Sequence, residues 1–179
     1  MYIPKATQQG ATPLTSPAAA FPPVAAPMIG GVGIIVNDKG HILVQLRDNN
    51  TDICPNALAL IGGAIENYDD THADCVIREA YEEAAIKVII LTKIHEGKNP
   101  YNSAYDHYHV AFTHAHDDDI VIGEGRDIKF MSLDDILASK MVSHHKEALE
   151  AAIPFLEHFT KIALSDEPLF DYRTHPTYE

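Results

Sequence analysis

The residues best suited to chemistry are three glutamates whose spacing brings their carboxylates to one side of a helix. Glu79, Glu82 and Glu83 occupy positions i, i+3 and i+4, which share one face of an α-helix. Carboxylates placed in this way repel one another, so the face is either a solvated surface or a site for hard cations. Mg²⁺ and Mn²⁺ prefer oxygen ligands and keep several waters, which suits carboxylates beside substrate phosphates. The spacing therefore indicates metal-dependent phosphate chemistry.

A short apolar run and a pair of glycines precede this helix. Residues 58–61 are apolar, and Gly62 and Gly63 follow them. Glycines at such a point let the backbone approach a metal or a phosphate closely, and the carbonyl of Gly62 can then serve as a ligand. The helix is predicted over residues 71–84, because small apolar residues recur there at helical spacing. This packing stripe consists of Ala73, Val76, Ile77, Ala80 and Ala84.

The segment from Gly63 to Ile86 resembles the Nudix box. The box reads Gly, five residues, Glu, seven residues, Arg-Glu, an apolar residue, any residue, Glu-Glu, any residue, Gly and an apolar residue. Residues 78–83 match it well, and the resemblance extends over roughly residues 28–160. It implies an α/β fold, namely an α/β/α sandwich with a mixed central sheet. It also implies cleavage of a nucleoside diphosphate linked to another group, with Mg²⁺ or Mn²⁺ as the cofactor.

The resemblance assigns a role to each matching residue. Glu82 and Glu83 correspond to the main metal ligands, and the carbonyl of Gly62 is a further ligand. Glu79 corresponds to a ligand or a general base. Arg78 orients Glu79 or Glu82 and pairs with the first acidic residue of the box. Catalysis in this scheme consists mostly of positioning and charge neutralisation.

The chain departs from the pattern in the loop before the helix. One extra residue separates Gly63 from Arg78, so the first acidic position falls on Asp69 or Asp70. Counting back from Arg78 selects Asp70 as the partner of the guanidinium. The late glycine of the box is Ala85 here. These departures motivate a second hypothesis, a Nudix-like module that binds a nucleotide without hydrolysing it, although the intact glutamates argue against it.

Three residues outside the box are further site candidates. Glu124 stands between glycines just before a predicted strand, where it is either a general base or metal ligand on a loop or an exposed charge in a turn. Arg47 ends a strand, and its guanidinium either grips a phosphate or pairs with a neighbouring aspartate. Tyr105 can stack on a nucleobase.

Histidine is abundant, with 11 residues in the chain. His107 and His109 are two apart and so share a strand face, which makes zinc conceivable, but no cysteine or second close pair completes such a site. His144 and His145 begin the last helix. We expect a proton-donating or base-stacking role for a histidine near the pocket rather than a zinc site.

Composition narrows the partners and the compartment. The formal net charge is −13, from 26 acidic and 13 basic residues. A field of this sign repels phosphate backbones, so nucleic-acid binding is not expected, whereas a small nucleotide is acceptable if cations neutralise the site. No apolar run approaches the length of about 18 residues that a membrane span needs. Two cysteines, Cys54 and Cys75, are too few for a disulfide framework and indicate a cytoplasmic protein.

The chain is expected to form one domain between two tails. Residues 1–27 are rich in Ala and Pro and are predicted to be a flexible tail, residues 28–163 the Nudix-like hydrolase domain, and residues 164–179 a C-terminal tail. Strand patterns cover residues 28–37, 41–48, 58–61, 87–91, 105–113 and 127–131. Helices are predicted from residue 71, residue 132 and residue 144. Strands on both sides of a central helix indicate a mixed sheet with helices on its faces.

The leading hypothesis is a Mg²⁺-dependent pyrophosphohydrolase whose substrate is a nucleoside diphosphate linked to another moiety. The segment from Gly123 to Ile136 resembles bacterial members that act on nucleotide sugars more than members that sanitise oxidised nucleoside triphosphates. A nucleotide sugar or a related small nucleotide is therefore the expected substrate. The alternatives are a house-cleaning nucleoside triphosphate pyrophosphohydrolase and the non-catalytic nucleotide sensor. The resemblance also admits a homodimer, which the sequence does not decide.

Overall fold

The computed structural model describes residues 28–123 and 127–163, so both predicted tails and Glu124 lie outside the described residues. The first two strands form the predicted hairpin. β1 (Ile29–Asn37) and β2 (Ile42–Leu46) are antiparallel, and the side chain of Asn37 accepts hydrogen bonds from the backbone of Lys39 and His41 at 3.0 Å. Gly40 has a φ of +73° in this turn, a conformation that glycine adopts without strain.

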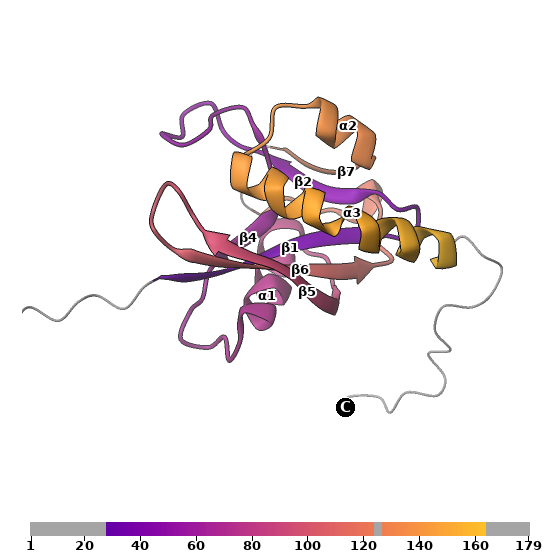
Figure 1. Cartoon of the computed structure of the whole chain (residues 1–179), viewed down its shortest axis with the longest axis horizontal. Helices are drawn as coiled ribbons and strands as arrows, with labels where there is room; N and C mark the ends of the chain where they lie inside the picture. The colour runs from indigo at the N-terminus through magenta and orange to yellow at the C-terminus, as the bar shows by residue number, and fades with distance from the viewer. Residues whose placement is uncertain (1–27, 124–126, 164–179) are drawn as a thin grey trace, which may run out of the picture.

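β1 is the central strand of a mixed sheet of seven strands (Figure 1). β1 pairs in parallel with β6 (Tyr105–Thr113) over its whole length, and β6 pairs antiparallel with β5 (Ile89–Lys98). The start of β1 pairs antiparallel with β4 (Ile61–Ala64), whereas the end of β1 pairs with β2. The remaining strands, β3 (Leu58–Ala59) and β7 (Asp127–Met131), both pair with β2. β1 therefore changes its partner along its length, which places β4 beside the first residues of the sheet's central strand.

Helix α1 (His72–Ala84) begins and ends by local capping. Thr71 is the N-cap and forms a reciprocal capping box with Asp74, which satisfies backbone donors at the helix start. Ala85 ends the helix with a φ of 57°, the left-handed conformation that usually falls to glycine. Its N–H donates to the carbonyls of Ala80 and Tyr81. The helix thus ends at the predicted place although the glycine of the box is missing.

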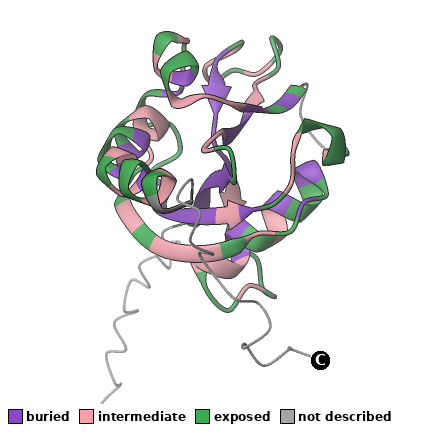
Figure 2. Ribbon diagram, turned by 90° about the vertical axis from the view of Figure 1, so that its right-hand side faces the viewer, coloured by how far each residue is buried: buried purple, intermediate pink, exposed green. Residues whose placement is uncertain are grey.

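The sheet residues divide between two apolar cores. One core lies between the sheet and α3 (Ser143–Ala163) and includes Val32, Ile34, Val36, Tyr108, Val110 and Leu149. The other lies between the sheet and α1 and includes Ile35, Leu43, Ile61, Ala80, Ala84 and Ala111. Successive strand residues point to opposite faces, so β1 and β6 supply both cores. The two helices α1 and α3 lie on opposite faces of the sheet (Figures 1 and 2), which confirms the predicted α/β/α sandwich.

Other elements follow the sequence prediction with three differences. The strand predicted over residues 58–61 is divided into β3 and β4, and β4 continues through Gly62 and Gly63. The 3-10 turn η1 (Asp117–Asp119) precedes β7, and α2 (Leu133–Ala138) starts at the predicted N-cap Ser132. The strand predicted over residues 87–91 instead runs as β5 to Lys98, because its polar second half pairs with β6. Ile77, predicted for the packing stripe, is 41% exposed. No helix among the described residues is long and apolar enough to cross a membrane.

Helix α1 lies unusually close to the start of the sheet. A Cβ atom added at Gly31 would lie 2.3 Å from the carbonyl oxygen of His72, so only a residue without a side chain permits this approach. At the same end, Nδ1 of His72 and Nε2 of His109 are 2.9 Å apart. His109 belongs to β6 and is 4% exposed. The first turn of the helix is therefore attached to both central strands.

The imidazole of His109 makes this attachment sensitive to acid. Burial, followed by the nearby charges of His72, His107 and Lys93, lowers the pKa of His109 to about 4. An exposed histidine in the unfolded chain titrates near pH 6.5. The unfolded state therefore binds more protons between these values, so the folded state loses stability as the pH falls from about 6.5 to about 4.

We expect the free energy of unfolding to fall by roughly 1–2 kcal/mol between pH 7 and pH 5 on account of His109. His109→Gln keeps a hydrogen-bonding side chain but removes this titration, so its stability should depend less on pH in chemical denaturation. The matched control is His114→Gln, since the side chain of His114 is 63% exposed. Equal pH slopes for wild type and His109→Gln would contradict the assignment.

Candidate active site

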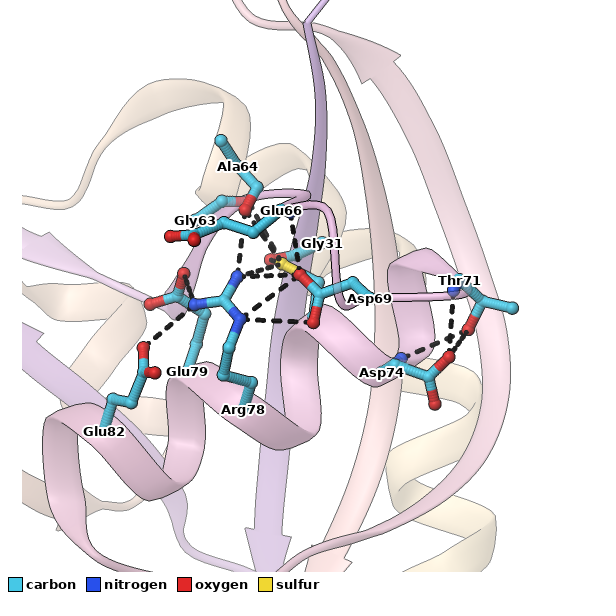
Figure 3. Close-up of polar contacts among 11 residues, drawn as sticks. Gly31, Gly63, Ala64, Glu66, Asp69, Thr71, Asp74, Arg78, Glu79 and Glu82 are labelled. Carbon is cyan, nitrogen blue, oxygen red and sulfur yellow. Dashed lines mark hydrogen bonds and ion pairs between the residues drawn. The ribbon is translucent and has the colours of Figure 1, made fainter.

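The side chain of Arg78 lies at the centre of the predicted site (Figure 3). Its Nη1 donates to Glu79 at 2.8 Å and to Glu82 at 2.9 Å. Its Nη2 donates to Asp69 and to the backbone carbonyl of Ala64, both at 2.9 Å. The side chain is 11% exposed. One planar guanidinium thus connects the helix, the preceding loop and β4, and it contacts two of the three glutamates that were predicted as metal ligands.

The acidic partner of Arg78 is Asp69, so the pairing with Asp70 predicted from residue counting is wrong. Asp69 closes a turn with Glu66, because Asp69 Oδ2 accepts from the Glu66 N–H and the Asp69 N–H donates to the Glu66 carbonyl. The extra residue of the loop is accommodated at exposed Asp70, immediately before the N-cap. Counting back along a regular spacing could not show where the loop places its extra residue.

This ion pair is charged throughout the neutral range. The hydrogen bond from Arg78 holds the pKa of the Asp69 carboxyl below its usual value. Hydrogen bonds to Asp69 first, then to Glu79 and Glu82, raise the pKa of the Arg78 guanidinium above its usual value. A fixed positive charge therefore offsets the repulsion between the carboxylates of α1.

Glu79 lies against the backbone of the Gly62–Gly63 pair. A Cβ atom added at Gly63 would lie 2.1 Å from Glu79 Oε1, so any side chain there would displace the carboxylate. The side chain of Glu79 is 15% exposed. A glycine is thus required at position 63, where the sequence predicted a close approach to the backbone. The group that approaches it is the carboxylate of Glu79 on the helix.

Glu83 is held apart from the other two glutamates. It is 7% exposed, and its Oε2 accepts from Nε2 of Gln45 at 2.8 Å. Gln45 lies on β2 between β3 and β7. Sequence reasoning missed this residue, although a glutamine within an apolar strand was a visible signal. Two separate donors, Arg78 and Gln45, therefore orient the three carboxylates.

Within the described part of the chain, no three His, Cys, Asp or Glu side chains converge closely enough to hold a metal ion. Glu79 and Glu82 share the guanidinium of Arg78, and Glu83 turns toward Gln45. The donors themselves are oxygen atoms, which suit Mg²⁺ or Mn²⁺. The helix thus presents a suitable donor set beside a glycine that leaves room for Glu79, and metal binding requires the carboxylates to reorient.

A cavity of about 220 Å³ opens on the other side of the glycine pair. Gly62, Gly63 and Ala64 form part of its wall. Further lining residues are Arg47, Ile53, Asn99, Tyr101, Asp106 and His144. Arg47 lies where the sequence placed a phosphate contact, with its Nε donating to the Ile53 carbonyl at 3.0 Å.

Tyr105, predicted to contact the base, does not line this cavity. Its ring packs edge-on against His107, and its hydroxyl lies 3.4 Å from Glu96 Oε1. Alternation along β6 directs Tyr105 to the face of α1 and Asp106 to the cavity. Tyr101, which precedes the strand, is the tyrosine that lines the cavity.

The chain before Glu124 passes beside the end of α1. The N–H of Gly123 donates to the backbone carbonyl of Glu83 at 2.8 Å. A Cβ atom at Gly123 would lie 2.0 Å from the carbonyl oxygen of Glu82, so the approach is close. Glu124 itself lies outside the described residues, and its assignment as a base or ligand stays a prediction.

Comparison with protein families and curated proteins gave one match. A family model described as the NUDIX domain matches residues 28–152. A search of curated proteins gave no match.

Comparison with solved structures gave Nudix proteins at low sequence identity, which by itself shows the fold alone. The NUDIX domain of Shewanella oneidensis NrtR complexed with ADP ribose has a TM-score of 0.61 and 18% identity, over 77% of this chain and 95% of that chain. A NUDIX hydrolase from Nitrosomonas europaea has a TM-score of 0.64 and 18% identity, over 75% and 74% of the two chains. A bifunctional NMN adenylyltransferase/ADP ribose pyrophosphatase from Francisella tularensis, complexed with AMP and a Mn ion, has a TM-score of 0.57 and 21% identity, over 75% and 43%.

The pairing of Arg78 can be tested with neighbouring substitutions. Asp69→Asn removes the charge from a carboxylate that is 3% exposed, and we expect it to lower the free energy of unfolding by about 1–3 kcal/mol. Asp70→Asn should change it by less than about 0.5 kcal/mol, since Asp70 is exposed. Chemical denaturation of both variants measures the difference. A larger loss in Asp70→Asn would restore the pairing that residue counting suggested.

Proposed function

The chain belongs to the Nudix family, and from this premise we propose that it is a pyrophosphohydrolase that cleaves a nucleoside diphosphate linked to another moiety. Nudix hydrolases act on phosphoanhydride bonds and generally use divalent metal ions. One observation supports the proposal most strongly. Gly63 of β4 lies against the carboxylate of Glu79, and both Gly62 and Gly63 line the cavity. A diphosphate lying along these glycines would reach both the carboxylates and the cavity.

The proposed cofactor is Mg²⁺, with Mn²⁺ as an alternative. Glu79, Glu82, Glu83 and the carbonyl of Gly62 would hold it, because they offer the oxygen donors that hard cations prefer. When bound, such an ion polarises a phosphoryl oxygen and makes a water ligand a stronger nucleophile. Arg78 limits the repulsion between Glu79 and Glu82 and restricts their orientations.

The remaining assignments concern residues around the metal ligands. Gln45 positions Glu83 through its hydrogen bond and is a positioning residue. Arg47 is proposed to bind a substrate phosphate from the cavity wall, because a guanidinium matches phosphate geometry. Glu79 or Glu124 is proposed as the general base. The hydrogen bond between Gly123 and the end of α1 supports the proposal for Glu124, since it directs the chain toward the glutamates.

We propose a small nucleotide, such as a nucleotide sugar, as the substrate. The cavity of about 220 Å³ is smaller than a typical ligand pocket of about 300–1,000 Å³, which favours enclosure of one moiety next to the phosphates. ADP ribose and AMP, which are bound in two similar structures, are small nucleotides of the same kind as the proposed substrate. The net charge of −13 disfavours nucleic acid as a partner. Both cysteines are free thiols, which supports a cytoplasmic location.

The first test is hydrolysis of a panel that contains nucleotide sugars, ADP-ribose, dinucleoside polyphosphates and nucleoside triphosphates. We expect turnover with Mg²⁺ or Mn²⁺ and none with chelator. Glu83→Gln should lower kcat about 100-fold or more, because it removes a charge that holds the cation at the developing transition state. Glu150→Gln, at an exposed site on α3, is the matched control.

The same panel separates the enzyme from the alternatives. Turnover of nucleoside triphosphates alone would identify the house-cleaning activity. Binding of nucleotides without turnover by the wild type would favour the sensor. The hydrogen bonds from Arg78 to both Glu79 and Glu82 would then be the first cause of the missing hydrolysis to examine.

The role of Glu124 is tested by its isosteric amide. If Glu124 is the general base, Glu124→Gln should lower kcat by about 10²–10⁴-fold with little change in KM. The acidic limb of the pH–rate profile should disappear with it, because that limb reports protonation of the base. Asp118→Asn, at an exposed position of η1, controls for loss of surface charge. A rate within twofold of the wild type would leave Glu79 as the base.

A further inference from the structure

The wall of the cavity contains a group of polar side chains that the proposed chemistry does not use. Asp106 is 5% exposed and lies opposite Gly30, where an added Cβ atom would lie 2.5 Å from Asp106 Oδ1. Nδ2 of Asn99 donates to Asp106 Oδ2 at 3.0 Å. Nε2 of His144 lies 3.7 Å from the same oxygen, too far for a hydrogen bond. Three polar side chains from β6, the loop before it and α3 thus meet in the wall.

His144 is the unusual member of this group. Neither ring nitrogen has a hydrogen-bond partner among the described residues, and both are buried. The side chain as a whole is 11% exposed. A buried polar atom without a partner destabilises the fold, so natural proteins rarely keep one without a reason. Two such atoms on one ring at a cavity wall indicate that a bound molecule supplies their partners.

Charge along the cavity decides which part of a substrate fits here. Arg47 lines the same cavity and attracts phosphate, whereas the carboxylate of Asp106 repels it. An ionised carboxylate only accepts hydrogen bonds, and Asn99 occupies one of its several acceptor positions. Burial lowers the pKa of His144, so its neutral ring offers one donor and one acceptor. The part of the wall formed by Asp106 and His144 therefore favours an uncharged group that carries hydrogen-bond donors.

We propose that Asp106 and His144 form a specificity subsite that binds neutral hydrogen-bond donors on the nucleoside half of the substrate. Ribose hydroxyls and a base amino group share this chemistry. The inference rests on the proposed function for the presence of a nucleotide in the cavity, with its phosphates beside Arg47. Asp106 and His144 select the substrate and take no part in bond cleavage.

The test is calorimetric binding of defined probes to metal-free full-length protein. The probes are AMP, 2′-deoxy-AMP, 3′-deoxy-AMP, IMP and inorganic pyrophosphate. Asp106→Asn should weaken AMP about 10-fold or more, because the donor of the nucleoside exchanges a charged acceptor for a weaker, neutral amide oxygen. Pyrophosphate should bind equally or more tightly, because a repelling charge is gone. A collapsed cavity would instead weaken both, so this contrast excludes a merely structural role.

The analogues identify the group that Asp106 and His144 recognise. If a ribose hydroxyl is bound, one deoxy-AMP should bind the wild type about 10-fold more weakly than AMP and lose little further affinity in Asp106→Asn. If the amino group is bound, IMP should show this behaviour instead. His144→Phe keeps the ring volume without its nitrogens and should reproduce the loss for AMP. Asp134→Asn and His158→Phe, at exposed positions, are the matched controls.

Two results would overturn the proposal: unchanged AMP affinity in both Asp106→Asn and His144→Phe, or no binding of any nucleoside probe to the wild type at millimolar concentration. Hydrolysis is scored separately on wild-type protein with Mg²⁺. A wild type that binds AMP in the expected pattern without hydrolysis would retain the subsite and reject the enzyme. A wild type that hydrolyses the panel with no effect of Asp106→Asn would retain the enzyme and reject the subsite.

Discussion

The hydrogen bonds of one guanidinium organise the candidate site. Arg78 presents its donors in a rigid plane, and they contact Asp69 in the loop, Ala64 on β4, and Glu79 and Glu82 on the helix. Without this cation, neighbouring carboxylates on one helix face would repel each other. The loop, strand and helix of the box therefore form one charge-balanced unit. A bound metal ion would add further positive charge to that of Arg78.

Two glycines let this unit pack closely against the rest of the fold, because they have no side chain. Gly31 lets α1 approach β1, and Gly63 lets Glu79 lie against β4. The same glycine pair then forms the cavity wall on the opposite side. A few atoms of backbone thus separate the carboxylates from the ligand space.

Charge is distributed so that each part of the site has a distinct partner. The carboxylates of α1 suit a cation, Arg47 suits a phosphate, and Asp106 with His144 suits an uncharged donor group. A chain with a net charge of −13 can bind an anionic nucleotide only if such local positive charge outweighs the overall field.

The sequence by itself determined the elements and the family, because caps, helical spacing and the glutamate pattern are local properties. Thr71, the glutamates of the helix and the strand over residues 105–113 lie where the pattern predicted. Tertiary structure decided the partners. Asp69 rather than Asp70 pairs with Arg78, because the turn around the extra residue sets the direction of each side chain. Gln45 on β2 reaches Glu83 on α1 because the fold packs the helix against the sheet. Asp106 rather than Tyr105 faces the cavity because the packing of α1 and α3 decides which face of β6 carries the cavity. No local pattern encodes such contacts.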